Sequence, residues 1–210
     1  PSGRAAGQPL VRGEADRGMS EGGPPRREVV GPRPEDDDPA RWRALAVVST
    51  AMLLSLSAWM TATAVGPDLQ ARWGLTAGQV GWLTTTVQLG FVAGTALAAL
   101  LNLADVVPAR GLFAASAALA ALVNALLLVT PGYAPALAVR FLTGMVLAGV
   151  YPPGMKMIST WVRSGRGLAI GTVVGALTVG KALPYLLKAI GGTGLAPVVL
   201  GASGAGLVAA

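Results

Sequence analysis

The sequence contains no cysteine and no histidine. Their absence excludes disulfides, thiolate and imidazole metal ligands, and the Ser-His and Cys-His pairs of nucleophilic catalysis. Charged residues are also scarce, because they make up 12% of the 210 residues, about half of the share that is usual in soluble domains. We therefore expect a protein that is not an enzyme and that carries no metal and no cofactor.

Hydrophobic residues are abundant instead, at 53% of the chain with a mean hydropathy of +0.60, which is typical of a membrane protein. Residues 1–42 differ from the rest, because they are rich in Gly, Pro, Arg and Asp. Such a composition cannot offset the entropy of ordering. We predict that residues 1–42 form a disordered cytoplasmic tail, in which the acidic run from Glu35 to Asp38 is a solvated spacer.

Six apolar segments follow, each with a length near the roughly 20 residues that cross a bilayer. They cover residues 44–65, 80–101, 109–130, 134–153, 167–187 and 194–210. Thr76 and Gln79 have the spacing of a capping box just before the second segment. The predicted fold class is an all-α membrane protein with six transmembrane helices in residues 43–210. Because the sequence begins with Pro and stops inside an apolar run, we expect it to be a piece of a longer chain.

Lys and Arg are distributed unequally between the two sides of these segments. If the N-terminus is cytoplasmic, the outer side receives only Arg72 and Lys188. The inner side receives Arg26, Arg27, Arg33, Arg41, Arg43, Arg110, Lys156, Arg163 and Arg166. The positive-inside rule therefore predicts a multi-pass protein of the cell (inner or plasma) membrane with a cytoplasmic N-terminus.

Glycines at a spacing of four residues predict close helix contacts. Gly90 and Gly94 have this spacing in the second segment, and Gly167, Gly171 and Gly175 repeat it in the fifth.

Three segments resemble parts of major facilitator superfamily transporters: "WGLTAGQVGWL" before the second span, "LNLADVVPARG" after it, and "RFLTGMVLAGVYPPG" in the fourth. Over residues 43–210 the chain resembles the N-terminal half of such a transporter. The resemblance implies 3+3 inverted repeats and alternating access. It also implies a second half, which we expect on the same chain; the alternative is that two chains pair. The stretch "GALTVGKALPYLL" resembles the branch that includes nitrate, nitrite and cyanate porters.

The loop after the second span matches part of the family's signature at Leu103, Ala104, Asp105 and Arg110. The resemblance implies that Asp105 and Arg110 latch the cytoplasmic side against the other half. Alternatively, Asp105 is a helix-end acid in a hydrated turn.

Pro152 and Pro153 interrupt backbone hydrogen bonding in the fourth span. As a hypothesis, this pair is a bending point of the inner gate; the alternative is a plain helix terminus.

Lys181 lies inside the fifth span, where a charged group is costly to bury and often marks a transport pathway. A rise of 1.5 Å per residue places Arg140 and Gln88 at a similar depth. No Asp or Glu falls inside the six segments, since Asp68 and Asp105 belong to loops. We therefore expect Arg140, Lys181 and Gln88 to bind an anionic substrate. The alternative for Lys181 is snorkelling to the membrane surface.

Ser57 and Thr61 fall on one stripe of the first span. They are candidates for the lining of a substrate cavity, and hydrogen bonds to their own or neighbouring helices are the alternative.

The predicted function is secondary transport of a small anionic solute. Further predicted partners are the lipid bilayer and the missing half, and no nucleic acid is expected. One alternative is a non-transporting membrane scaffold or sensor. Another is a rhomboid-type serine protease, because "GASG" places Ser203 in that family's nucleophile signature, although no histidine is present to activate it.

Overall fold

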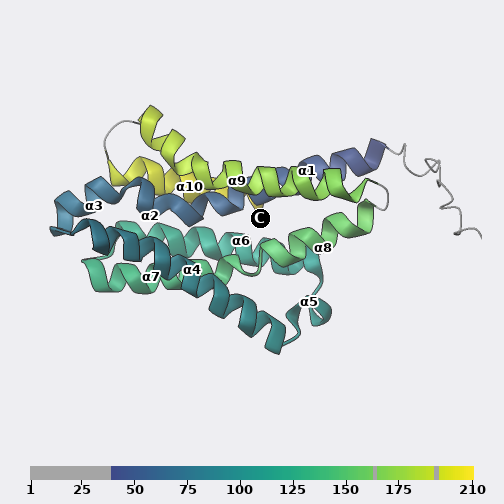
Figure 1. Ribbon diagram of the computed structural model, residues 1–210, viewed down its shortest axis with the longest axis horizontal. Helices are drawn as coiled ribbons and strands as arrows, with labels where there is room; N and C mark the ends of the chain where they lie inside the picture. Colours follow the sequence, from purple (N-terminus) through teal and green to yellow (C-terminus); the bar gives the residue numbers. More distant parts are fainter. Residues whose placement is uncertain (1–38, 163–164, 192–193) are drawn as a thin grey trace, which may run out of the picture. The chain divides into compact units, whose positions relative to one another are not determined.

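The computed structural model describes residues 39–162, 165–191 and 194–210 (Figure 1). Most of the predicted tail lies outside the described residues. Its last part, residues 39–42, belongs to the first helix, which begins at Pro39.

The described residues form helices joined by short turns, in agreement with the all-α prediction. In chain order they are α1 (Pro39–Ser55), η2 (Leu56–Met60), α2 (Thr61–Ala64), α3 (Gly66–Trp73), α4 (Ala77–Leu100), α5 (Leu103–Val106), α6 (Ala109–Ala125), η3 (Leu126–Leu128), α7 (Tyr133–Leu147), α8 (Tyr151–Trp161), α9 (Arg166–Gly191) and α10 (Leu195–Ala209).

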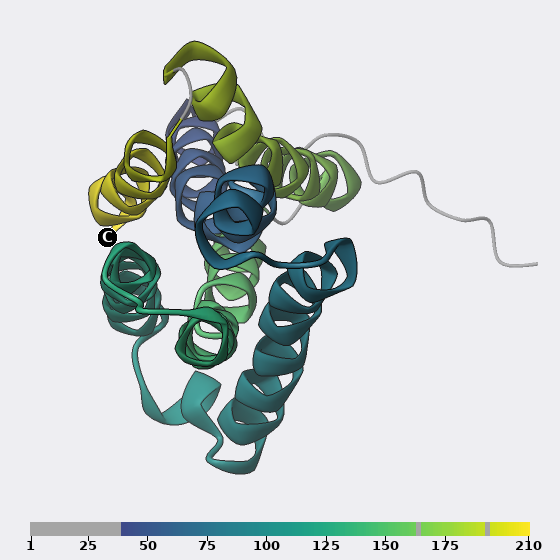
Figure 2. The same cartoon turned by 90° about the vertical axis from the view of Figure 1, so that its left-hand side faces the viewer.

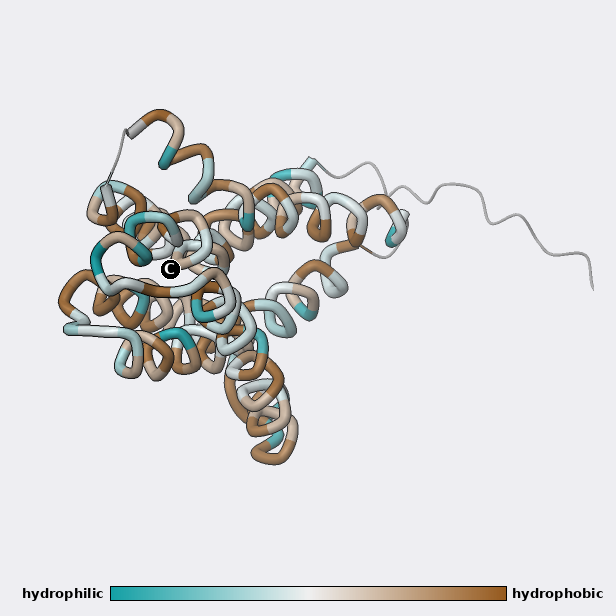
Figure 3. The backbone as a smooth tube through the Cα atoms, turned by 60° about the vertical axis from the view of Figure 1, so that its left-hand side comes forward, coloured by the Kyte–Doolittle hydropathy of each residue, from teal (hydrophilic) through white to brown (hydrophobic). Residues whose placement is uncertain are grey.

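Five helical stretches among the described residues are long and apolar enough to cross a membrane. They are Pro39–Ala64, Ala77–Leu100, Ala109–Leu128, Tyr133–Trp161 and Arg166–Ile190. The sixth predicted span corresponds to α10, which has 15 residues and is therefore about 22 Å long. Hydrophobic segments recur along the helices in Figure 3, and many large apolar side chains, such as Leu100 (84% exposed) and Val208 (80%), face outward. This outward apolar surface is what contact with lipid requires.

The start of α4 agrees with the sequence prediction. Thr76 is its N-cap, and the Thr76 side chain accepts a hydrogen bond from the Gln79 backbone N–H at 3.3 Å. In return, the Gln79 side chain accepts from the Thr76 backbone N–H at 2.8 Å. This capping box satisfies two donors that the first helical turn leaves free.

Helices α4 and α7 pack closely because glycines remove the side chains between them. A Cβ atom on Gly90 would lie 2.0 Å from the Phe141 carbonyl oxygen, and one on Gly144 would lie 1.9 Å from the Val87 carbonyl oxygen. Neither backbone oxygen could move aside without shifting a helix. The predicted contact of the second-span glycines is confirmed, with α7 as the partner.

Helix α9 packs on α1 through a different glycine from those predicted (Figures 1 and 2). A Cβ atom on Gly180 would lie 2.2 Å from the Leu53 carbonyl oxygen, whereas Gly167, Gly171 and Gly175 have open space where a Cβ would be. The prediction that these three glycines mediate a helix contact is wrong for the described residues, because they lie on the outward face of α9. Spacing alone does not reveal which face of a helix meets its neighbour.

The fourth span does not end near residue 153, as the sequence predicted. It is interrupted by turns at residues 148–150 and resumes as α8, with the prolines in its first turn. Pro152 and Pro153 therefore begin a helix segment inside the span, because the first turn of a helix needs no N–H from them. One helix thus ends at Leu147 and the next begins at Tyr151, and the bending point at this pair stays a prediction.

Candidate functional site

Arg140 is fully buried at the centre of a hydrogen-bond network that joins four helical stretches. From α7 it donates through Nη1 to Asn124 Oδ1 on α6 at 2.9 Å. Through Nη2 it donates to the carbonyl oxygens of Ala58 at 3.0 Å and Trp59 at 2.6 Å, both in η2. The Asn124 amide in turn donates to Ser203 Oγ on α10 at 3.0 Å.

The first span tightens into a 3₁₀ turn at η2, and the network binds it there. The turn changes the backbone hydrogen bonding at mid-span, and the Arg140 guanidinium binds two carbonyls there that would otherwise face a low-dielectric interior. Arg140 has no exposed surface, so it does not present its charge to a solute in this conformation. Its Nε atom is the one nitrogen of the side chain without a partner in the described part of the chain.

The hydroxyls of Ser57 and Thr61 also point into the protein. Ser57 Oγ donates to the carbonyl oxygens of Leu54 at 2.6 Å and Ala202 at 3.1 Å, and Thr61 Oγ1 donates to the Ser57 carbonyl at 3.2 Å. Both residues are fully buried. They tie the first span to itself and to α10, so the arrangement is the alternative that the sequence left open rather than a cavity lining.

Lys181 lies in a different environment, at the edge of a cavity of about 240 Å³. Its side chain is half-buried, and its Nζ atom lies 4.3 Å from the centroid of the Trp59 ring, a cation–π contact. No carboxylate of the described residues forms an ion pair with it. The cavity is lined by Leu56, Trp59, Phe91, Tyr151, Val174, Leu177 and Lys181.

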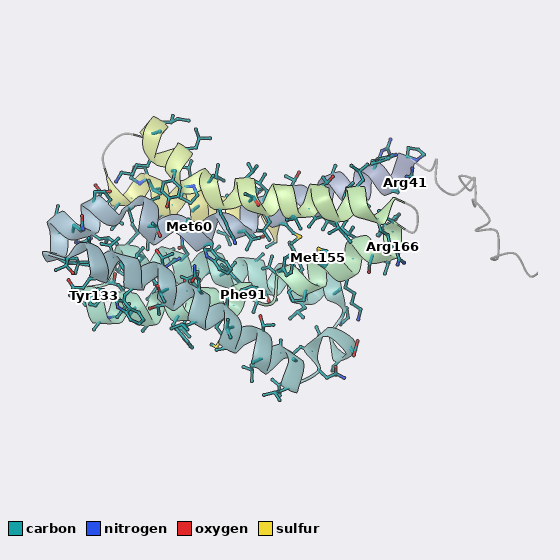
Figure 4. The ribbon with its side chains drawn as sticks, viewed as in Figure 1. Arg41, Met60, Phe91, Tyr133, Met155 and Arg166 are labelled. Atoms are coloured by element: carbon teal, nitrogen blue, oxygen red, sulfur yellow. The ribbon has the colours of Figure 1, made fainter. Side chains whose placement is uncertain are left out.

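The cavity draws its walls from the first, second, fourth and fifth spans. In Figure 4, Phe91 on α4 lies between the end that carries Arg41 and Arg166 and the end that carries Tyr133. The cavity therefore lies well within the length of the spans and away from their ends.

Two of the four spans around the cavity have an interrupted helix near it, and a third lacks one backbone hydrogen bond there. The first span contains η2, and the fourth breaks at residues 148–150, directly before the lining residue Tyr151. The fifth contains Pro184, which lacks the N–H that would bond the carbonyl of Gly180, next to Lys181. Interrupted helices near the midplane are a feature of repeat-built transporters, since they supply backbone groups and bending points at the site.

Gln88 is exposed on α4, about one turn before Phe91, and is not among the lining residues of the cavity. The structure thus brings together Lys181 with aromatic residues, and separates it from Gln88 and from the guanidinium of Arg140. Trp59 connects the two cations, since its ring contacts Lys181 and its carbonyl binds Arg140.

At the end of the bundle where α1 begins, Asp105 of α5 forms an ion pair with Lys156 of α8 at 3.3 Å. Both side chains are exposed, at 69% and 48% respectively. Arg110 does not join this pair; it lines a groove of about 460 Å³ with Arg43 and Trp161. At the opposite end, Lys188 of α9 forms an ion pair with Asp68 of α3.

Sequence reasoning missed Trp59, Tyr151 and Asn124. Asn124 carried a signal, because an amide inside an apolar span is rare and needs a partner in lipid. The two aromatic residues carried none, since tryptophan and tyrosine near apolar spans usually mark the membrane interface. Within the described residues there is no cluster of three or more acidic side chains that could hold a metal ion.

A family model described as Major Facilitator Superfamily matches residues 47–210. This match covers every residue that lines the cavity. None of the curated proteins matches the chain.

Proposed function

Because the chain belongs to the major facilitator superfamily, whose members are generally membrane transporters rather than enzymes, we propose that it moves a small anionic solute across the membrane by alternating access. The solute binds in the cavity beside Lys181, whose ammonium group supplies the attractive charge. Arg140 acts indirectly in this proposal, because it fixes the η2 backbone and therefore the position of Trp59.

The observation that carries the proposal is the isolated charge of Lys181. It is the one charged residue lining the cavity, and no acidic side chain in the part of the chain that the structure describes neutralises it. A cation inside a membrane protein is costly unless it has a partner or faces a polar pathway. A bound anion supplies the missing partner.

A second six-helix bundle completes the site in this proposal. Helices α4 and α9 present wide exposed faces, since only 22% and 17% of their apolar stretches are buried. The two bundles, each of 3+3 inverted repeats, rock around the cavity, as is usual for repeat-built carriers.

The N-terminus lies in the cytoplasm in this proposal, so that the end bearing Arg41, Arg110 and Arg166 faces inward. This orientation follows the positive-inside rule and is the one expected for a cell (inner or plasma) membrane. Pro152 and Pro153 then lie in the inner half of the fourth span, where they serve as a bending point during closure. Asp105 and Arg110 lie at the cytoplasmic surface, where they latch the two bundles.

The two alternatives have less support. A scaffold or sensor needs no cavity with an unneutralised charge. A rhomboid-type protease needs Ser203 as a nucleophile, but Ser203 is 5% exposed and accepts a hydrogen bond from Asn124, and the sequence holds no histidine to activate it.

Reconstitution of the full-length protein into liposomes tests the proposal. Labelled nitrate, cyanate, acetate and benzoate are offered against the same unlabelled anion inside, and uptake into protein-free liposomes is subtracted. We expect saturable counterflow of at least one anion, lost in Lys181→Ala. The control Arg72→Ala removes a positive charge on exposed α3, away from the cavity, and should retain uptake. Absence of saturable uptake for all four anions, or unchanged uptake in Lys181→Ala, would refute the proposal.

A further inference from the structure

The walls of the Lys181 cavity are apolar on every side that the described bundle provides. Of the lining residues, Leu56, Val174 and Leu177 have hydrocarbon side chains, and Phe91 adds an apolar ring. The cavity thus combines one positive charge with a large apolar surface.

Few hydrogen-bond donors accompany the ammonium group. Apart from Lys181, only the Trp59 indole N–H and the Tyr151 hydroxyl among the lining side chains could donate. Both belong to ring side chains, whose remaining surface is apolar. On this side of the cavity, an anion therefore exchanges its bound water for at most three donor groups.

The aromatic wall is also held in place. The rings of Trp59 and Phe91 pack at a centroid distance of 5.0 Å with an interplanar angle of 57°. The Trp59 backbone is bound by Arg140, the residue is 9% exposed, and Lys181 Nζ lies over its ring. A wall fixed in this way presents a preformed apolar surface, which raises affinity because little ordering is needed on binding.

Two kinds of anion would respond differently to such a site. An inorganic oxyanion has oxygen on all sides, so most of its polar surface would face hydrocarbon without replacement hydrogen bonds, at a large desolvation cost. A carboxylate with an apolar body places its oxygens on one side only. Its hydrocarbon part gains by burial against leucine, valine and aromatic side chains.

We propose that the solute is an organic monocarboxylate with an apolar or aromatic body, its carboxylate on the Lys181 ammonium and its body against Phe91, Val174 and Leu177. This inference rests on the proposed transport of anions and narrows it to one substrate class. It predicts that inorganic anions such as nitrate, nitrite and cyanate bind more weakly than apolar carboxylates.

Binding of a homologous series tests the inference. Acetate, butyrate, hexanoate and benzoate, with nitrate for comparison, are titrated by calorimetry into the full-length protein in lipid nanodiscs at pH 7.5. Heats from empty nanodiscs are subtracted. We expect Kd to fall about 2- to 4-fold for each added methylene, with benzoate tighter than acetate and nitrate the weakest.

Two variants separate the ionic contact from the apolar one. Lys181→Ala should weaken all four carboxylates at least tenfold. Leu177→Ala should flatten the dependence on chain length, whereas Leu122→Ala, which changes an exposed leucine of α6 outside the cavity, should leave the whole series unchanged.

The outcomes distinguish this inference from the transport proposal. Lys181-dependent binding of nitrate that exceeds binding of hexanoate and benzoate would overturn the substrate class and leave anion transport standing. A chain-length dependence that persists fully in Leu177→Ala would also overturn it, since the apolar body would then bind elsewhere. If no anion binds in a way that depends on Lys181, both the substrate class and the anion-transport proposal are overturned.

Discussion

The Nζ atom of Lys181 lies 4.3 Å from the centroid of the Trp59 ring, so a cation of the fifth span rests on an aromatic side chain of the first. The backbone of the same tryptophan accepts a hydrogen bond from Arg140. One tryptophan therefore links a charge that is sealed in the protein to a charge that faces a cavity. The two cations, which lie at similar depth in the sequence-based spans, have different tasks.

This division of tasks predicts different effects on stability. Arg140→Ala leaves Asn124 Oδ1 and the carbonyls of Ala58 and Trp59 buried without their donor, which should cost about 3 kcal/mol or more in the free energy of unfolding. Lys181→Ala removes one half-buried side chain and should cost about 1 kcal/mol or less. Thermal unfolding in detergent measures both.

Arg140→Lys serves as the control. It keeps the positive charge but lacks the planar guanidinium group that binds all three acceptors. We expect an unfolding temperature below that of the wild type and above that of Arg140→Ala. An Arg140→Ala protein as stable as the Lys181→Ala protein would contradict the structural role of Arg140.

The close contact of α4 and α7 predicts that alanine substitutions at different glycines have different effects on stability. Gly144→Ala should destabilise the protein by about 1–3 kcal/mol, because the added methyl group would overlap the Val87 carbonyl. Gly171→Ala should be neutral or slightly stabilising, since nothing lies within 4 Å of its Cβ position and alanine is the better helix former. Equal unfolding temperatures for the two variants would show that the contact is not as close as described.

The contact at Gly180 predicts an effect on the site itself. Because Gly180 precedes Lys181 and packs on the Leu53 carbonyl, Gly180→Ala should push α9 away from α1 and separate Lys181 from Trp59. We expect weaker anion binding, by several-fold, and altered tryptophan fluorescence. Gly175→Ala is the matched control in the same helix, with open space at its Cβ position. Equal anion affinity in the two variants would rule out this coupling.

The ion pair between Asp105 and Lys156 predicts an effect on transport rate and not on stability. Exposed pairs contribute about 0–1 kcal/mol, so Asp105→Lys should barely change the unfolding temperature. If the pair positions the latch loop, Asp105→Lys should slow counterflow, and the double variant with Lys156→Asp should recover much of the rate. A double variant as slow as Asp105→Lys would show that Asp105 acts without Lys156.

Much of the fold was predictable because it follows from local rules. The capping box at Thr76 and Gln79 marked the start of α4, and apolar length placed five of the candidate spans. The break at η2 was not predictable, because "LSAWM" contains no proline or glycine. The carbonyls of that turn accept hydrogen bonds from the side chain of Arg140, which is distant in the sequence.

The site was predictable only in part, where local features of the sequence determine it. The depth of Lys181 in an apolar span marked it as a candidate site residue, and the structure places it at the edge of a cavity. The directions of Ser57 and Thr61 were not predictable, because a hydroxyl can bond its own helix on any face. Trp59 became part of the site only through the packing of the first span against α4 and α9.

The most direct test of the central claim replaces the charge of Lys181 and then restores it chemically. In a full-length protein whose other cysteines, if any, are removed, Lys181→Cys should lose binding of benzoate and nitrate by at least tenfold. Aminoethyl methanethiosulfonate, which adds a positive charge to the thiol, should restore most of the binding, and the negatively charged sulfonatoethyl reagent should not. Wild-type affinity in unmodified Lys181→Cys, or equal effects of the two reagents, would contradict the claim that the charge at position 181 binds the anion.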